Sequence, residues 1–298
     1  MAKDTPVVDG VLVCDKPAGP TSHDVVARVR RLAGQRRVGH AGTLDPPATG
    51  VLVVALGRAT RLLPWLPLEP KGYLARIRFG TATDTLDATG EVTATAPAGH
   101  VDEAAVKAGL AAMVGPAMQV PPMVSAIKVG GERLYAKARR GEEIEREPRP
   151  VVLHALELLG FEAGPSGPEA LVDVTCSGGT YVRSIADDLG RALGSAAHLA
   201  DLRRTRVGSF TAGDAAALDT LEAGGRDALL AALLDPAAAM AGVGTRALDE
   251  AEAADLAVGK PLTPTGTPGP IAAGAPGGRL LAVVEDERGR ARPRVVLA

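Results

Sequence analysis

The chain has 298 residues, of which 46% are hydrophobic, enough for a sizeable core, but only 2% are aromatic. The core must therefore consist mainly of Val, Leu, Ile and Ala, so each aromatic side chain is a candidate for a specific role. The net charge of -2 gives no global sign of nucleic-acid or membrane binding, and no apolar run reaches transmembrane length. Cys14 and Cys176 lie in apolar runs without metal-ligand spacing, so we expect a soluble, cytoplasmic protein with two buried thiols.

The N-terminal segment begins with an apolar strand over residues 10–14, which ends in an Asp-Lys-Pro turn containing Lys16. Thr21 and Ser22 predict the start of a helix, because hydroxyl side chains cap helix N-termini. Its buried face is predicted from apolar residues at helical spacing: Val25, Val26, Val29 and Leu32. Its other face and the residues after it carry a basic cluster: Arg28, Arg30, Arg31, Arg36 and Arg37. Such a cluster is either a solvated surface or a nucleic-acid contact.

Residues 37–50 read RVGHAGTLDPPATG and run into an apolar strand over residues 50–56. Their glycines and prolines exclude a helix or a central strand and predict a rigid loop. His40 and Asp45 are the two side chains in it that suit chemistry. A loop that presents one carboxylate ahead of a buried strand is a plausible active-site platform. The alternative is a tight turn in which Asp45 satisfies its own backbone.

The next segment alternates apolar and polar residues over 71–79, which predicts a half-buried strand with Tyr73 on its apolar face. Residues 80–87 form a polar loop, and a helix is expected from Asp102 to Met113. Residues 119–150 are an insertion-like stretch that becomes highly charged.

The following segment contains two predicted strands, 151–159 and 170–176. A helix from Tyr181 to about Leu193 comes next, followed by an extended segment over residues 199–210. Arg183 lies in the first turn of this helix, where the partial positive charge of the helix end disfavours a cation. We therefore expect Arg183 to point out of the helix toward a nearby anion.

From residue 212 the composition changes. Residues 212–256 are helical in pattern, residues 259–278 form a connector dense in Gly, Pro and Thr, and two short strands, 280–284 and 295–297, predict a terminal hairpin. We predict a main domain over residues 1–244 and a small accessory module over residues 245–298.

The chemistry that these residues allow is limited. The sequence contains no phosphate-binding loop, dinucleotide fingerprint or serine-nucleophile elbow, and its five histidines are scattered without metal-ligand spacing. Asp45 could pair with Asp84 or Asp87 as in a hydrolase, although no spacing supports that pairing. An aspartate beside an arginine stays ionised because the cation lowers its pKa, which suits a nucleophile or electrostatic stabiliser.

Seven motifs occur in an order that resembles the TruB-type tRNA pseudouridine synthases. They are GVLVCDKP at 10–17, HAGTLDPPATG at 40–50, KGY at 71–73, GTATDTLD at 80–87, the segment 119–128, GTYVR at 179–183 and the segment 198–204. The resemblance covers roughly residues 10–210. It rests on the ordered set, because a single Leu-Asp-Pro would be weak evidence.

The resemblance implies that the chain isomerises the T-loop uridine of tRNA, position 55, to pseudouridine without cofactor or metal. It implies that Asp45 is the essential carboxylate and that Arg183 pairs with it. It also implies that Tyr73 stacks on the flipped base, that Leu202 lines the uracil pocket and that His40 lies near the extruded nucleotide. Core packing for Tyr73 or Leu202, and a structural loop role for His40, remain the alternatives.

The resemblance also implies RNA contacts. A base in a folded loop must leave its stack before an enzyme can act on it, so we expect recognition of the T arm by shape and phosphates. Residues 119–150 correspond to the family's RNA-clamping thumb, although Val124 stands where many members have an aromatic. The RNA contacts that we expect are Lys16, Arg36, Arg37, Lys128, Arg139 and Arg140, with a structural role as the alternative for Lys16.

Together these observations predict an α+β fold: a mixed, mostly antiparallel central sheet flanked by helices, with a thumb insertion and a small, β-containing C-terminal module. That module would correspond to a PUA-like RNA-binding domain, which its Pro/Gly-interrupted sequence matches poorly. We expect tRNA as partner, no guide RNA, no membrane and a monomer. Two alternatives stay open: a non-catalytic tRNA-binding or tRNA-folding protein, and a glycosidase or nucleoside hydrolase with a second carboxylate.

Overall fold

The computed structural model describes residues 7–123, 128–129, 132–133, 144–164 and 167–297, with the backbone alone for 128–129 and 132–133. The chain forms two compact units. Unit 1 comprises Met1–Pro46, Gly50–Leu68 and Val207–Ala298, and unit 2 comprises Pro47–Thr49 and Glu69–Arg206. Among the described residues, no helix is both long enough and apolar enough to cross a membrane.

The sheet of unit 1 is built on two long antiparallel strands, β1 (Gly10–Lys16) and β3 (Thr49–Leu56). Short strands extend it: β2 (Val38–Ala41) pairs with β3, while β14 (Ala216–Ala217) and β15 (Leu233–Leu234) pair with β1. Side chains from both faces of β1 and β3 are buried in two separate cores. This burial explains why both strands read as continuous apolar runs rather than alternating ones.

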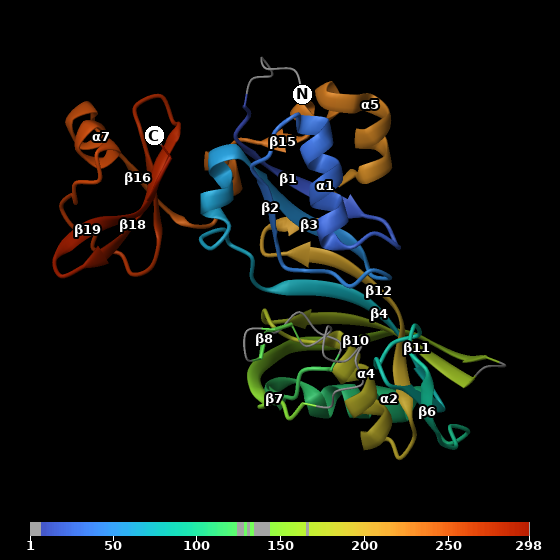
Figure 1. The fold of residues 1–298 in the computed structure, drawn as a ribbon. Coiled ribbons are helices and arrows are strands. Elements are labelled where there is room, and N and C mark those ends of the chain that lie inside the picture. The colour runs from blue at the N-terminus through green and yellow to red at the C-terminus, as the bar shows by residue number, and fades with distance from the viewer. Residues whose placement is uncertain (1–6, 124–127, 130–131, 134–143, 165–166, 298) are drawn as a thin grey trace. The chain divides into compact units, whose positions relative to one another are not determined.

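The first helix of unit 1 begins where Thr21 and Ser22 predict it. α1 (Ser22–Ala33) starts at a capping box between Thr21 and Asp24 and ends at Gly34, whose φ of 67° is the left-handed conformation that glycine favours. α1 packs beside α5 (Leu218–Ala231) over one face of the sheet (Figure 1). The remaining short elements here are η1 (Gly57–Leu62), β13 (Phe210–Thr211) and α6 (Pro236–Ala239).

Unit 2 contains a sheet in the order β12-β4-β11-β10-β7, covered on one face by two helices (Figure 1). Its strands are β12 (Ala197–Val207), β4 (Lys71–Phe79), β11 (Gly167–Cys176), β10 (Arg149–Gly164) and β7 (Gly115–Gln119). The helices are α2 (Glu103–Met113), capped by Asp102, and α4 (Val182–Ala192). Tyr73, Ala75, Ile77 and Phe79 alternate along β4 into the core beneath these helices.

The C-terminal part of unit 1 carries a four-stranded sheet in the order β16 (Gly244–Ala247), β17 (Ile271–Gly274), β18 (Leu280–Glu287) and β19 (Arg290–Val296). Helix α7 (Glu250–Ala257) packs on it. Strands β18 and β19 form the predicted hairpin, closed by Arg288 and Gly289, both at positive φ as a tight two-residue turn requires. The domain boundary between residues 244 and 245 stays a prediction.

The α+β fold class with mixed sheets and a small C-terminal sheet is confirmed. Several local predictions were wrong. Residues 38–41 of the expected loop form the short strand β2, because its backbone finds partners along β3. Residues 285–287 and 290–294 continue the hairpin strands. Residues 81–83 of the expected polar loop form β5 (Thr81–Thr83), which pairs with β6 (Val92–Thr95). The sequence carried no prediction for β6, or for β8 (Lys128–Val129), which pairs with β9 (Glu132–Arg133).

Candidate active site

The loop that carries Asp45 in unit 1 is fixed on both sides of the aspartate. Before it, the hydroxyl of Ser22 accepts a hydrogen bond from Leu44 N at 2.9 Å and donates to Leu44 O at 3.1 Å. After it, Pro46 O accepts hydrogen bonds from Gly19 N at 2.9 Å and from Lys16 Nζ at 3.0 Å. Asp45 itself is half-buried. The helix start and the Asp-Lys-Pro turn therefore hold the backbone of this carboxylate from two directions.

Lys16 is one of the expected RNA contacts, but its side chain is 0% exposed. Its ammonium donates to Pro17 O at 2.8 Å as well as to Pro46 O. Backbone carbonyls thus replace the water that a buried ammonium loses. A buried ammonium cannot reach a phosphate, so we retain the structural alternative for Lys16.

His40 lies on β2, paired with Val54 of β3, and is half-buried. Its ring meets the ring of His23 edge to face, with centroids 5.2 Å apart and planes at 86°. A contact between His40 and a nucleotide stays a prediction.

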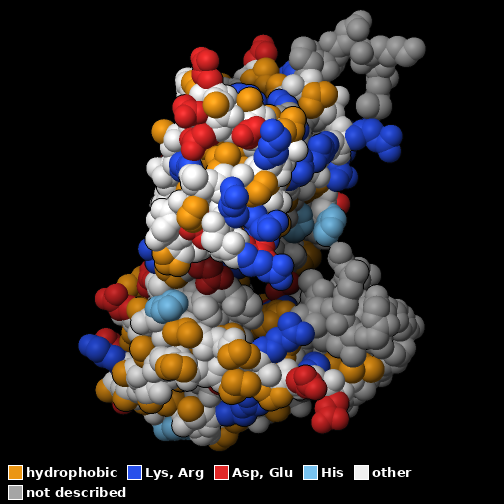
Figure 2. Space-filling view, turned by 90° about the vertical axis from the view of Figure 1, so that its left-hand side faces the viewer, with side chains coloured by type: hydrophobic (Ala, Val, Ile, Leu, Met, Phe, Trp, Pro, Cys, Tyr) orange, Lys and Arg blue, Asp and Glu red, His pale blue; other side chains and the backbone are white. Residues whose placement is uncertain are grey.

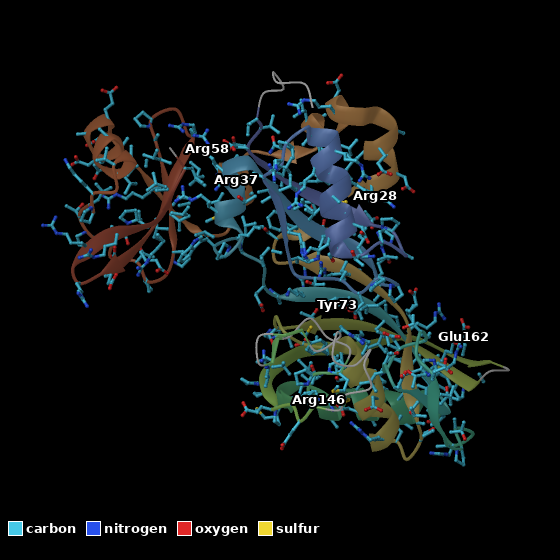
Figure 3. All side chains as sticks on the ribbon, in the orientation of Figure 1. Arg28, Arg37, Arg58, Tyr73, Arg146 and Glu162 are labelled. Atoms are coloured by element: carbon cyan, nitrogen blue, oxygen red, sulfur yellow. The ribbon has the colours of Figure 1, made fainter. Side chains whose placement is uncertain are left out.

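Tyr73 of β4 is buried in the core of unit 2, with 6% of its surface exposed (Figure 3). Its hydroxyl accepts a hydrogen bond from the guanidinium of Arg204 on β12. Burial raises the pKa of Tyr73, and the Arg204 charge opposes that rise. Core packing and a specific polar contact are therefore both present at this residue.

Gly72, beside Tyr73 in the Lys-Gly-Tyr motif, allows β12 to approach closely. A Cβ at this position would lie 3.0 Å from Thr205 Oγ1 and 3.3 Å from Arg206 Cβ. Arg206 reaches Thr175, the residue opposite Gly72 on β11, at 3.4 Å. The missing side chain thus leaves room for an arginine of β12 to cross β4.

Arg183, 4% exposed, points out of α4 toward an anion, as its place in the first turn predicts. Its Nη1 donates to Thr85 O at 2.9 Å and lies 3.5 Å from Asp87 Oδ2. Asp87 is held in turn by the hydroxyl of Thr85 at 2.8 Å and by Thr89 N at 3.0 Å. The 80–87 motif therefore binds this guanidinium through one backbone carbonyl and one carboxylate.

The same motif is tied to β12, which carries Leu202. Leu199 N donates to Leu86 O and Ala88 N donates to Leu199 O, both at 3.0 Å. Leu202 is partly buried and packs against the core that contains Tyr73. Unit 2 therefore brings Tyr73 and Leu202 onto one core, and Arg183 contacts the 80–87 motif that is bonded to the strand of Leu202.

The backbone at the start of α4 is clamped by Gln119, a buried residue at the end of β7. Its amide nitrogen donates to Tyr181 O at 3.0 Å, and its amide oxygen accepts from Tyr181 N at 2.7 Å. This pair of hydrogen bonds fixes the turn that leads to Arg183.

The basic cluster of unit 1 is exposed, as an RNA contact requires. Arg30, Arg31, Gly34, Gln35 and Arg36 line a surface depression at the end of α1. Arg37 is exposed, and its Nε donates to Thr60 Oγ1 at 3.1 Å. Figure 2 shows Lys and Arg side chains close together on one face of unit 1.

The predicted thumb is described only in part. Arg139 and Arg140 lie outside the described residues, as do Val124 and the side chain of Lys128. Their RNA contacts stay predictions.

The predicted site residues are divided between the two units. Asp45 and His40 belong to unit 1, whereas Tyr73, Arg183 and Leu202 belong to unit 2. The expected pairing of Asp45 with Arg183 stays a prediction.

Sequence reasoning missed the supporting roles of four residues: Ser22, Asp87, Gln119 and Arg204. For three of them, the sequence contained a feature that could have identified the role. Asp87 and Gln119 stand inside or at the start of the recognised motifs, and Arg204 lies two residues after Leu202, on the same face of a strand. No sequence pattern marked Ser22 as more than part of a helix cap.

Three family descriptions together match most of the chain. The N-terminal domain of TruB family pseudouridylate synthases matches residues 30–182. The tRNA pseudouridylate synthase B C-terminal domain matches residues 183–240, and the C-terminal domain of tRNA pseudouridine synthase II matches residues 244–298.

Curated relatives match over nearly the whole length. The chain is 52% identical to tRNA pseudouridine synthase B of Thermobifida fusca over 296 residues, covering 98% of this chain and 99% of the relative. It is 50% identical to tRNA pseudouridine synthase B of Nocardia farcinica over 288 residues, covering 97% and 93%.

Among solved structures, the chain is similar to one in a Cbf5-Nop10-Gar1 complex, with a TM-score of 0.75 and 26% identity, covering 97% of this chain and 85% of that chain. A chain of an archaeal box H/ACA sRNP Nop10-Cbf5 complex gives a TM-score of 0.72 at 26% identity, covering 97% and 86%.

Proposed function

The chain belongs to the TruB family and is a tRNA pseudouridine synthase, and we propose that it acts on the uridine at position 55 in the T loop. The observation that carries this proposal is that hydrogen bonds hold the backbone on both sides of Asp45. Ser22 and Lys16 hold the residues on either side of it, Leu44 and Pro46, by direct hydrogen bonds. A carboxylate that must act on one atom of a bound nucleotide needs such a fixed backbone.

In this proposal the uridine leaves the loop stack and enters the site as a flipped nucleotide. The N1–C1′ bond breaks, the uracil turns over, and C5 joins C1′ while the C5 hydrogen leaves as a proton. Asp45 is the catalytic carboxylate of this rearrangement. Water must be kept out meanwhile, because a ribosyl intermediate exposed to water would hydrolyse.

The groups of unit 2 receive the base in the same proposal. Tyr73 stacks on the uracil and Leu202 lines its pocket, both on a rigid core. Arg183 pairs with Asp45 and keeps it ionised. Asp87, which accepts hydrogen bonds from Thr85 and Thr89, orients the guanidinium for that pairing.

We also propose that the enzyme binds the T arm of tRNA without a guide RNA, as a cytoplasmic monomer. The basic cluster around Arg36 and Arg37 supports phosphate contact, because exposed arginines neutralise backbone charge. The relatives named tRNA pseudouridine synthase B match at 50–52% identity, about twice the 26% of the chains from the Cbf5-containing complexes. This difference supports a stand-alone enzyme.

The test uses a T-arm hairpin with tritium at uridine C5. Pseudouridine formation releases that hydrogen, whereas binding or glycosidic hydrolysis leaves it on the base. We expect release by the wild type and none by Asp45→Asn, with RNA binding kept in both. Asp84→Asn is the matched control, and this variant should retain activity. Among the hydrogen bonds described, the carboxylate of Asp84 accepts only one, from the exposed backbone N–H of Glu91.

Two outcomes would contradict the proposal. A wild type that binds the hairpin without releasing tritium would favour a non-catalytic tRNA-binding protein. Loss of activity in Asp84→Asn, with free uracil as the wild-type product, would favour a hydrolase with paired carboxylates.

A further inference from the structure

Arg204 of β12 is a buried cation to which neither the proposed chemistry nor the resemblance gives a role. It is 1% exposed and the largest by volume of the fully buried side chains described. A guanidinium in such a place loses its hydration, which costs free energy unless acceptors replace the water. Its presence in the core of unit 2 therefore calls for a specific partner.

One partner of Arg204 within unit 2 is the hydroxyl of Tyr73. Arginine carries donors and no acceptor, so the phenolic oxygen must accept the hydrogen bond. The phenolic proton is then directed away from Arg204. Burial keeps the pKa of Tyr73 raised, so the phenol stays protonated at neutral pH and can donate that proton to a further acceptor.

The strand geometry brings these two side chains together. β12 lies next to β4 in the sheet, and Gly72 allows the close approach of Thr205 and Arg206. Side chains alternate along a strand, so Arg204 points to the face opposite the Thr205 side chain. Arg206, two residues further along β12, reaches Thr175 rather than Tyr73. Thr175 lies on the opposite face of the sheet from Tyr73, because it pairs with Gly72 whereas Val174 pairs with Tyr73.

The charge of Arg204 also acts on Lys71, two residues before Tyr73 on β4. Burial, followed by the positive charge of Arg204, lowers the pKa of Lys71. Arg204 thus acts on two members of the Lys-Gly-Tyr motif: its charge lowers the pKa of Lys71, and its guanidinium donates a hydrogen bond to Tyr73.

We propose that Arg204 is a positioning residue for Tyr73: its guanidinium fixes the hydroxyl, and with it the plane of the ring, so that the ring face and the phenolic proton are presented to the flipped base. This inference rests on the proposed function only in taking Tyr73 as the residue that receives the base. Arg204 itself acts through Tyr73 and needs no contact with RNA.

The test is a double-mutant cycle between Arg204→Met and Tyr73→Phe. Single-turnover rates and dissociation constants are measured with the tritiated T-arm hairpin. We expect Arg204→Met to lower the rate by roughly 10- to 100-fold in the wild type, because a misplaced ring loses its near-attack geometry. In the Tyr73→Phe background, Arg204→Met should lower the single-turnover rate by less than about threefold, because the hydroxyl that Arg204 holds is already absent.

Two further variants separate positioning from stability. Arg204→Lys, which keeps the charge, should restore part of the rate, and it remains informative if Arg204→Met folds poorly. Arg206→Met is the matched control: it removes an arginine from the same strand that does not bond Tyr73, and it should stay within about threefold of the wild-type rate.

An ultraviolet titration of the phenol gives a readout independent of substrate. The difference between each protein and its Tyr73→Phe counterpart isolates Tyr73 among the three tyrosines of the chain. Arg204→Met should raise the Tyr73 pKa further, because the nearby cation is lost. An unchanged titration, or the same fold-loss of rate in both backgrounds, would overturn the proposal. An inactive wild type would instead contradict the T-loop assignment, and the titration would still decide the role of Arg204.

Discussion

Arg183 and Asp87 form a buried ion pair in unit 2, with Nη1 3.5 Å from Oδ2 and side-chain exposures of 4% and 11%. The two residues come from motifs about 100 positions apart in the sequence. Thr85 joins them, since its carbonyl accepts from Arg183 and its hydroxyl donates to Asp87. The arginine is thereby oriented by the protein alone, as the proposed role of Arg183 in a preorganised site requires.

Replacing Asp87 with Asn should loosen that orientation. The amide keeps one acceptor for Thr85 but loses the charge that faces Arg183. We expect a loss of about 1–3 kcal/mol in transition-state stabilisation, or roughly 5- to 150-fold in single-turnover rate. Binding of the hairpin should change little. A rate equal to that of the Asp84→Asn control would show that Asp87 does not act through Arg183.

Replacing Ser22 with Ala removes both hydrogen bonds to Leu44 and leaves its buried backbone groups unpaired. We expect a loss of about 1–3 kcal/mol of folding free energy, measured by urea unfolding. The rate should also fall, because Asp45 follows Leu44 directly. Ser209→Ala at an exposed turn is the control, and it should change neither quantity. Unchanged activity in a destabilised Ser22→Ala would mean that the loop does not position Asp45.

Replacing Gly72 with Ala should destabilise unit 2. The new Cβ would meet Thr205 Oγ1 at 3.0 Å and Arg206 Cβ at 3.3 Å, closer than ordinary contacts. We expect a cost of about 1–3 kcal/mol in unfolding free energy from this overpacking. Gly160→Ala on β10 is the control, because open space surrounds its Cβ position. Equal unfolding midpoints for the two variants would contradict the close approach of β12.

Replacing Arg36 or Arg37 with Ala tests the basic cluster. Each change should weaken hairpin binding and reduce the slope of log K against log salt by about 1 if the arginine contacts a phosphate. Arg191→Ala is the control, since that exposed arginine pairs with Asp187 within α4. An unchanged salt slope in both variants would make the cluster an ordinary solvated surface.

Local patterns in the sequence predicted much of the fold. The limits of β4 and the start of α2 followed from alternation and from the Asp102 cap, because both signals lie within the segment itself. β2 was missed because its pairing depends on β3, a partner that its glycine-containing sequence does not reveal. The same holds for β5, whose residues were predicted as part of the polar loop 80–87 and form a strand because they pair with β6.

The predicted site was recognised from motifs, which identify residue types but not their supports. Arg183 was expected to face an anion, and Asp87 is the anion that it faces within unit 2. Lys16 shows what the sequence could not decide. It was predicted in a turn, with either a structural or an RNA-facing role, and the fold places it at the end of β1, buried against two carbonyls. Burial of a charged residue depends on contacts distant in sequence, so spacing alone did not predict it.

The most direct test of the central claim is to map the product in a full-length, unmodified tRNA transcript. After reaction, chemical labelling of pseudouridine followed by primer extension reports each modified position. We expect a single stop, one nucleotide 3′ of position 55, which disappears with Asp45→Asn and with a transcript carrying cytidine at position 55. Modification elsewhere with position 55 untouched, or a signal that persists in Asp45→Asn, would contradict it.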